Sequence, residues 1–196
     1  MSSSPSSREA SRARTRDALV SAARDLAVAQ GWANVRMADV AAVAGVSRQT
    51  VYNEFDGRDG LAEALAVREI RTFVTGVRDH LYTYGADIEA AGRAAILHAL
   101  EQAAGNPLVH AVVTDAHGSA GELLLFLTTR SDLVLSTAGE VVREWATTFL
   151  PEIPQTRVAI AAESIVRLTV SHIVRPSAPA QQTADVLADV LVRLLR

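Results

Sequence analysis

The chain has 196 residues, of which 49% are hydrophobic and only 5% aromatic, and it contains no cysteine. This composition excludes a disulfide framework and thiolate chemistry, removes the usual zinc ligands, and favours packed helices over a sheet. The net charge of −3 argues against a protein that coats nucleic acid non-specifically.

The N-terminal segment is rich in serine and locally basic. Residues 1–16 carry four arginines against one acid, whereas residues 61–196 carry 11 arginines and 15 acids. We expect residues 1–14 to form a flexible arm, either one that contacts nucleic acid or a tail that only aids solubility. The segment lacks the apolar core of a signal peptide, and no run of about 18 uncharged apolar residues follows it. We therefore expect a cytoplasmic protein with no membrane span.

The next segment has an apolar stripe at three- and four-residue steps, formed by Leu19, Ala22, Ala23 and Leu26. This spacing predicts a helix from about residue 15 to residue 30 with one buried face. Gly31 is placed to end that helix.

Residues 37–55 have the pattern of a helix-turn-helix. Gly45 falls where the chain must turn sharply with a positive φ, and Ser47 is suited to cap the second helix. Three valines are spaced to pack between the two helices: Val40, Val46 and Val51. The alternative is a helical hairpin in an ordinary α-domain. The second helix favours DNA binding, because it carries five side chains that can donate hydrogen bonds to phosphates or bases: Arg48, Gln49, Thr50, Tyr52 and Asn53.

The remaining chain also reads as helical, with glycine and proline between the segments. The helices are expected near residues 58–84, 87–104, 108–115, 133–150, 156–174 and 181–195. The run from Leu123 to Leu127 is apolar on every side, so it must be buried. No strand pattern is present, and we expect an all-α protein with about nine helices.

The sequence resembles the TetR family of bacterial repressors over about residues 10–65. The residues that carry the resemblance are Thr15-Arg16, Ala22-Ala23, Gly31-Trp32, the run from Met37 to Ser47, Thr50-Val-Tyr and Phe55-x-x-Arg58-Asp-x-Leu61. The resemblance implies a three-helix DNA-binding domain at 15–57 and a ligand-binding and dimerisation domain at 58–196. It also implies a homodimer formed through about 156–196, where two apolar helices flank a loop bracketed by prolines.

The same resemblance assigns roles on the DNA. Thr50 and Tyr52 would contact phosphates, with Arg36 and Arg58 as further basic contacts. Gln49 and Arg48 would read bases, since Gln pairs with adenine and Arg with guanine. Two positions depart from the family pattern. Asn53 replaces a usual histidine, and Glu54 replaces a usual aromatic residue; its carboxylate either accepts from a cytosine amine or, as we expect, points toward Arg58 or another arginine.

An effector cavity is the second implication of the resemblance. The candidate lining residues are Phe73, His98, Leu124, Phe126, Leu127, Arg130, Trp145 and Phe149. Apolar residues at helical spacing also serve as ordinary core, and that alternative applies to each of them. The low polarity of 123–127 suggests a lipophilic effector, whose head group Arg130 could bind. Two strings, Leu-Leu-Leu-Phe-Leu-Thr-Thr-Arg and Tyr-Asn-Glu-Phe, also resemble TetR regulators associated with alkane or fatty-acid oxidation.

Catalytic and metal-binding signatures are missing from the sequence. His110, Asp115 and His117 lie close together, but no second ligand sits at the i, i+4 step that helical metal sites use. We expect no cofactor, no metal and no enzyme activity. The prediction is a dimeric repressor that binds a pseudo-palindromic operator and is released by a small lipophilic effector. The alternatives are a helical binding protein whose helix-turn-helix no longer binds DNA, and an enzyme that uses the apolar cavity.

Overall fold

The computed structural model describes residues 7–106, 108 and 131–196. The described residues form eight α-helices and one short 3-10 helix, which confirms the all-α class. Their bounds are α1 Ser7–Gln30, η1 Trp32–Asn34, α2 Met37–Ala44, α3 Arg48–Phe55, α4 Arg58–Tyr84, α5 Ile88–Gly105, α8 Ser131–Phe149, α9 Gln155–Val174 and α10 Ala180–Leu195. The helix expected at 108–115 and the apolar run at 123–127 lie outside the described residues.

Helix α1 begins earlier than the sequence analysis predicted. It starts at Ser7 and runs 24 residues to Gln30. The expected flexible arm at 1–14 is therefore wrong for residues 7–14, which are helical. The physical reason is tertiary, because arginines of this extension bond to α3, as described below.

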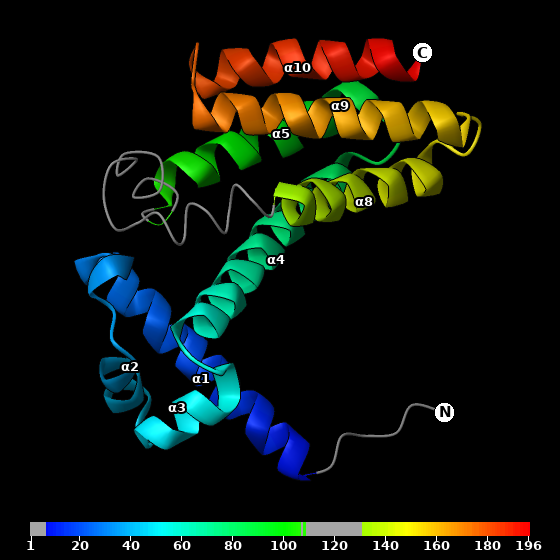
Figure 1. Cartoon of the computed structure of the whole chain (residues 1–196). Coiled ribbons are helices and arrows are strands. Elements are labelled where there is room, and N and C mark those ends of the chain that lie inside the picture. Colours follow the sequence, from blue (N-terminus) through cyan, green and yellow to red (C-terminus); the bar gives the residue numbers. More distant parts are fainter. Residues whose placement is uncertain (1–6, 107, 109–130) are drawn as a thin grey trace.

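The helices enclose two hydrophobic cores, and α4 contributes to both (Figure 1). The first core joins α1, η1, α2, α3 and the start of α4, around Leu19, Val40 and Leu61. The second core joins the rest of α4 with α5, α8, α9 and α10, around Leu81 and Trp145. Helices α9 and α10 run side by side at the end of the molecule opposite α2 and α3. The long helix α4 thus joins the two ends.

A polar contact and an apolar one link the end of α5 to the first core. Arg24 Nε donates to Glu69 Oε1 at 2.9 Å, which ties α1 to α4. Asn106 Nδ2 donates to the other oxygen of Glu69 at 3.4 Å. Leu108, just beyond α5, is buried in the first core. A helix of the second core is therefore attached at its C-terminal end to the first.

The turn between α2 and α3 forms as its residue types require. Gly45 has φ +68° and follows α2, a left-handed conformation in which glycine carries no steric penalty. Ser47 Oγ accepts a hydrogen bond from the Thr50 backbone N–H at 3.1 Å, which caps α3. Val40 and Val51 are fully buried, and Val46 packs against the same core. The predicted helix-turn-helix geometry is confirmed. No helix in the described ranges is long and apolar enough to span a membrane.

Candidate DNA-binding surface and effector cavity

Helix α3 presents one buried face and one exposed polar face. Its buried residues are Val51 and Phe55. The exposed residues include four predicted DNA contacts: Arg48, Gln49, Tyr52 and Asn53. Because these four share the outward side of a two-turn helix, they are available together to one groove of DNA.

Two of these side chains are already ordered by their neighbours. Gln49 Nε2 donates to Asn53 Oδ1 at 2.9 Å, one helical turn away. Thr50 is half-buried, and its hydroxyl lies 2.8 Å from Ser47 Oγ. Arg36, which precedes α2, is exposed. The hydrogen bond between Gln49 and Asn53 leaves the remaining amide atoms of both side chains able to meet base edges.

Arg58 has a structural position that the sequence did not predict. Its Nη2 donates to the backbone oxygen of Trp32 at 2.7 Å, and its guanidinium lies 5.4 Å from the centre of the indole ring. These contacts fasten the first turn of α4 to η1. The expected phosphate contact is corrected on this ground, because the half-buried guanidinium is directed into the domain.

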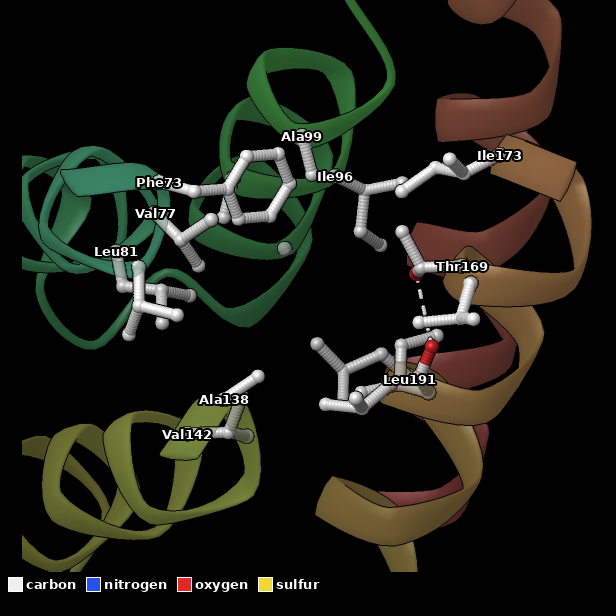
Figure 2. A pocket seen from close by; sticks show the side chains of 16 residues that line it. Phe73, Val77, Leu81, Ile96, Ala99, Ala138, Val142, Thr169, Ile173 and Leu191 are labelled. Carbon is white, nitrogen blue, oxygen red and sulfur yellow. Dashed lines mark hydrogen bonds between the residues drawn. The ribbon is translucent and has the colours of Figure 1, made fainter. Parts of the chain in front are cut away.

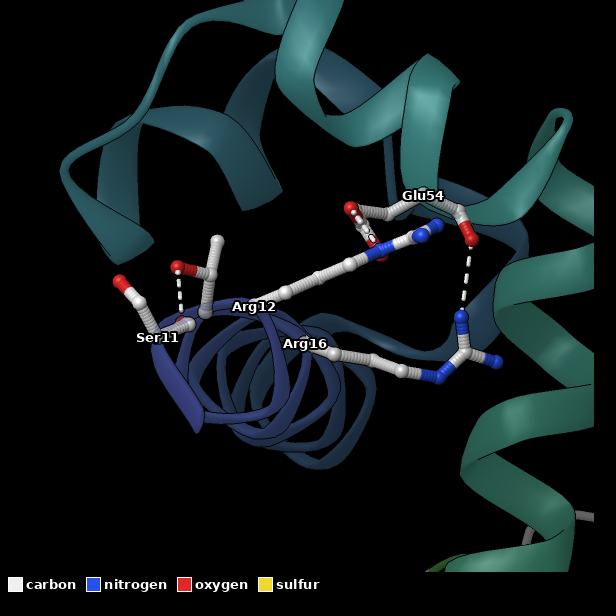
Figure 3. Close-up of polar contacts among 5 residues, drawn as sticks. Ser11, Arg12, Arg16 and Glu54 are labelled. Atoms are coloured by element: carbon white, nitrogen blue, oxygen red, sulfur yellow. Dashed lines mark hydrogen bonds and ion pairs between the residues drawn. The ribbon is translucent and has the colours of Figure 1, made fainter. Parts of the chain in front are cut away.

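Glu54 is bound by arginines of α1 (Figure 3). Arg12 Nε donates to Glu54 Oε1 at 2.9 Å and to Oε2 at 3.1 Å. Arg16 Nη1 donates to the backbone oxygen of Glu54 at 2.8 Å, and its guanidinium lies 4.4 Å from the centre of the Phe55 ring. The prediction that Glu54 points toward an arginine is confirmed, and the partner is Arg12. Sequence reasoning missed Arg12 and Arg16, although their four-residue spacing places them on one face of a helix.

The second core contains an apolar cavity of about 70 Å³ (Figure 2). Side chains of α4, α5, α8, α9 and α10 line it, among them Phe73, Ile96, Val142 and Leu191. Thr169 supplies the one hydroxyl of the lining, and its Oγ1 already donates to the backbone oxygen of Ile165 at 2.8 Å. The cavity therefore offers almost no free hydrogen-bonding group to a ligand.

The predicted lining residues divide into three groups. Phe73 lines the cavity. His98, Trp145 and Phe149 do not, and their assignment to the lining is corrected. Trp145 is fully buried and donates from Nε1 to the backbone oxygen of Gly85 at 2.8 Å, while Phe149 packs edge-on against Tyr82. The others, Leu124, Phe126, Leu127 and Arg130, lie outside the described residues.

His98 belongs to a contact between α4 and α5. Its ring stacks on that of His80 with the ring centres 4.3 Å apart. His80 Nδ1 lies 2.8 Å from the backbone oxygen of Gly76. Burial lowers the pKa of His98, and the neighbouring His80 lowers it further, while Glu101 and Asp79 act in the opposite direction. The pair is not a metal site, since no group of three or more suitable ligands exists within the described residues.

Comparisons with known proteins agree with this geometry. Residues 19–65 match the model of bacterial regulatory proteins of the tetR family, and residues 87–193 match the bacterial tetracyclin repressor C-terminal domain. The HTH-type transcriptional regulator AlkX of Mycobacterium tuberculosis is 33% identical over 187 residues, which cover 95% of this chain and 86% of that protein. The chain belongs to the TetR family.

Two solved structures place it further within the TetR family. The TetR family repressor AlkX from Dietzia sp. strain DQ12-45-1b, implicated in biodegradation of n-alkanes, is 31% identical with a TM-score of 0.74, over 91% of this chain and 94% of that one. The fatty acid degradation regulator FadR from Bacillus halodurans shares the fold at 18% identity and a TM-score of 0.54, over 93% and 96% of the two chains.

Membership of the TetR family settles the class of function. The protein is a DNA-binding transcriptional regulator with a helix-turn-helix, and TetR regulators typically dimerise. The family consists of regulators and not of enzymes, so the enzyme alternative is removed.

Proposed function

We propose that this TetR regulator is a repressor that binds a pseudo-palindromic operator as a homodimer and leaves it when a lipophilic effector binds. The observation that carries the proposal is the pairing of an exposed hydrogen-bonding face on α3 with an apolar cavity that α4 itself lines. A change at the cavity therefore acts on the same helix that follows α3 directly in the chain.

On the DNA, α3 would lie in the major groove. Gln49 and Arg48 would read bases, while Thr50, Tyr52 and Arg36 would contact phosphates. Phosphate contacts fix the register of the protein on the duplex, and base contacts select the sequence. Asn53 would contribute through its hydrogen bond with Gln49, which fixes the direction of the Gln49 amide.

The dimer would form through α9 and α10. These helices expose four large apolar side chains: Ile160, Leu168, Val174 and Val186. Scattered apolar side chains are normal on a protein surface, but four on two adjacent helices suit burial against a second copy. Two α3 helices held in this way would enter successive major grooves about one helical turn apart.

The effector would be lipophilic, because the cavity has an apolar lining whose single hydroxyl is already engaged. Burying a polar ligand group there without a partner would cost roughly 1–3 kcal/mol. The cavity is also smaller than the 300–1,000 Å³ typical of ligand pockets, so an effector would have to widen it. Widening would displace α4 and favour a state whose α3 helices no longer fit the groove spacing. The Dietzia repressor's association with n-alkane degradation supports a hydrocarbon-like effector.

DNA binding is tested by a mobility-shift assay on the DNA upstream of the protein's own gene. We expect Tyr52→Phe to weaken binding about five- to tenfold, since one phosphate hydrogen bond of about 1 kcal/mol is lost. Tyr84→Phe is the matched control, because the two tyrosines are similarly exposed (44% and 48%) and Tyr84 lies at the far end of α4. If the wild type bound this DNA no better than random DNA, and selection from a genomic library recovered no preferred site, the alternative of a helix-turn-helix that no longer binds DNA would stand.

Effector release is tested with decane and decanoic acid as probes. Ala99→Leu fills the cavity from α5, and Ala104→Leu changes an exposed alanine of the same helix. We expect a probe to release DNA from the wild type and from Ala104→Leu at similar concentrations, and from Ala99→Leu only at concentrations at least tenfold higher. Equal release from all three proteins would place the effector outside this cavity.

A further inference from the structure

The N-terminal extension of α1 and the last turn of α3 are joined by contacts that the role of α3 alone does not explain. Arg12 and Arg16 stand one helical turn apart on α1 and converge on a single residue, Glu54 (Figure 3). We propose that Arg12 and Glu54 are a positioning pair for DNA binding, in which Arg12 acts through Glu54 and not through a phosphate. The proposal rests on the DNA-binding function proposed above.

Helix α3 needs an external support at its C-terminal end. It has only eight residues and buries only two of them, Val51 and Phe55. The last carbonyl groups of a helix have no partner within it, and positive charge near them is favourable. Arg16 supplies both, since it donates to the Glu54 carbonyl and covers the Phe55 ring. The extension of α1 therefore fixes the end of α3 that Phe55 alone would hold.

Charge gives the second reason. Glu54 directly follows Asn53 on the helix that is proposed to face the phosphates, where a free carboxylate would be repelled. Arg12 accounts for both carboxylate oxygens, and the Glu54 side chain is only 13% exposed. Arg12 thus neutralises this carboxylate and holds it against α1.

The contribution of this pair to folding stability is expected to be small. The Arg12 side chain is 68% exposed, and ion pairs at exposed positions contribute little to folding. Loss of Arg12 should therefore be felt mainly in DNA affinity, because the freed Glu54 can then turn toward the phosphates. Loss of the Glu54 charge should remove most of that penalty.

The experiment compares full-length wild type, Arg12→Met, Glu54→Gln and the double variant on the operator fragment across a range of salt concentrations. Arg14→Met is the matched control, because Arg14 is an exposed arginine of the same extension for which the described residues provide no recorded ion pair. We expect Arg12→Met to bind at least tenfold more weakly, Glu54→Gln two- to threefold more weakly, and the double variant like Glu54→Gln. Arg14→Met should lose less than twofold.

The salt dependence separates positioning from direct contact. If Arg12 acts through Glu54, the slope of log affinity against log salt stays at the wild-type value in Arg12→Met. A slope reduced by about 0.9, together with a double variant as weak as Arg12→Met, would show a direct phosphate contact and overturn the proposal.

A measurement without DNA keeps the pair testable if the wild type binds no operator. In thermal unfolding of the same four proteins, the double variant should lose about 1–2 °C less in Tm than the sum of the two single variants. Additive Tm losses would show that the two side chains do not interact in solution. Absence of DNA binding together with non-additive losses would instead contradict only the proposed function.

Discussion

The two ends of the molecule are held together in different ways. At the DNA-binding end, charged side chains cross between elements and donate to fixed acceptors. Arg16 bonds the carbonyl of Glu54, and Arg58 bonds that of Trp32. At the effector end, the helices meet through apolar side chains around a cavity, and its ion pairs Arg78–Glu144 and Arg93–Asp185 lie at the surface.

This difference matches what each end is proposed to do. A hydrogen bond is directional, so bonds between elements fix the angle at which α3 meets DNA. Apolar contact is non-directional, so a core built from it can repack around a ligand with less loss. Helix α4 belongs to both cores, and two of its glycines show the contrast at atomic scale.

The largest effect is expected for Gly60→Ala, which tests the rigid end. A Cβ at Gly60 would lie 1.8 Å from the backbone oxygen of Phe55, and that oxygen cannot move unless the end of α3 moves with it. We expect a loss of about 3 kcal/mol in the free energy of unfolding, measured by urea denaturation, and loss of operator binding.

Gly105→Ala is the control for Gly60→Ala. A Cβ at Gly105, the last residue of α5, would meet no atom within 4 Å. The change should be neutral or should stabilise by up to about 1 kcal/mol, because alanine restricts the unfolded chain. If Gly60→Ala were as stable as Gly105→Ala, the junction between α3 and α4 would be softer than its contacts indicate.

Gly76→Ala makes the corresponding test at the other end of α4, with a smaller expected effect. Its Cβ would lie 2.2 Å from Nε2 of His98, which is the far end of a side chain. The His98 ring can move only by leaving its stack on His80. We expect a loss of about 1–2 kcal/mol in urea denaturation.

The His98→Ala background supplies the control for Gly76→Ala. With the ring removed, Gly76→Ala should be neutral or stabilise by up to about 1 kcal/mol, since alanine favours a helix interior more than glycine does. An equal loss in both backgrounds would show that the ring is not the obstacle.

Local chemistry explains which parts of the fold could be predicted from the sequence. The helix-turn-helix is specified by neighbours in the chain, since Gly45 sets the turn and Ser47 caps α3. The contact of Arg12 with Glu54 spans 42 residues. Its only local signal is the four-residue spacing of arginines, and the serine-rich, basic composition around them favoured an arm instead.

The cavity could be predicted in kind but not in its residues. Phe73 and Trp145 have the same apolar helical spacing, which indicates only that each faces inward. The packing of five helices decides that Phe73 borders the cavity while Trp145 fills the core and bonds Gly85. A sequence pattern fixes the buried face of one helix but not the gap left where several such faces meet.

The smallest predicted effect is a pH dependence at the contact between α4 and α5. Burial and the neighbouring His80 hold the pKa of His98 below its ordinary value of about 6.5, against the opposing pull of Glu101 and Asp79. In the window below about 6.5, the unfolded chain binds a proton that folded His98 resists, so the free energy of unfolding falls as the pH falls. Above that window, both states carry a neutral ring and the effect disappears.

Urea midpoints of wild type and His98→Asn between pH 7.5 and pH 5.5 measure this contribution. The wild type should lose more stability across the range than the variant, because asparagine does not titrate. Parallel losses in the two proteins would assign the pH dependence to other groups. A steeper loss in the wild type would show that the α4–α5 contact, unlike the arginine contacts of the DNA-binding end, weakens on mild acidification.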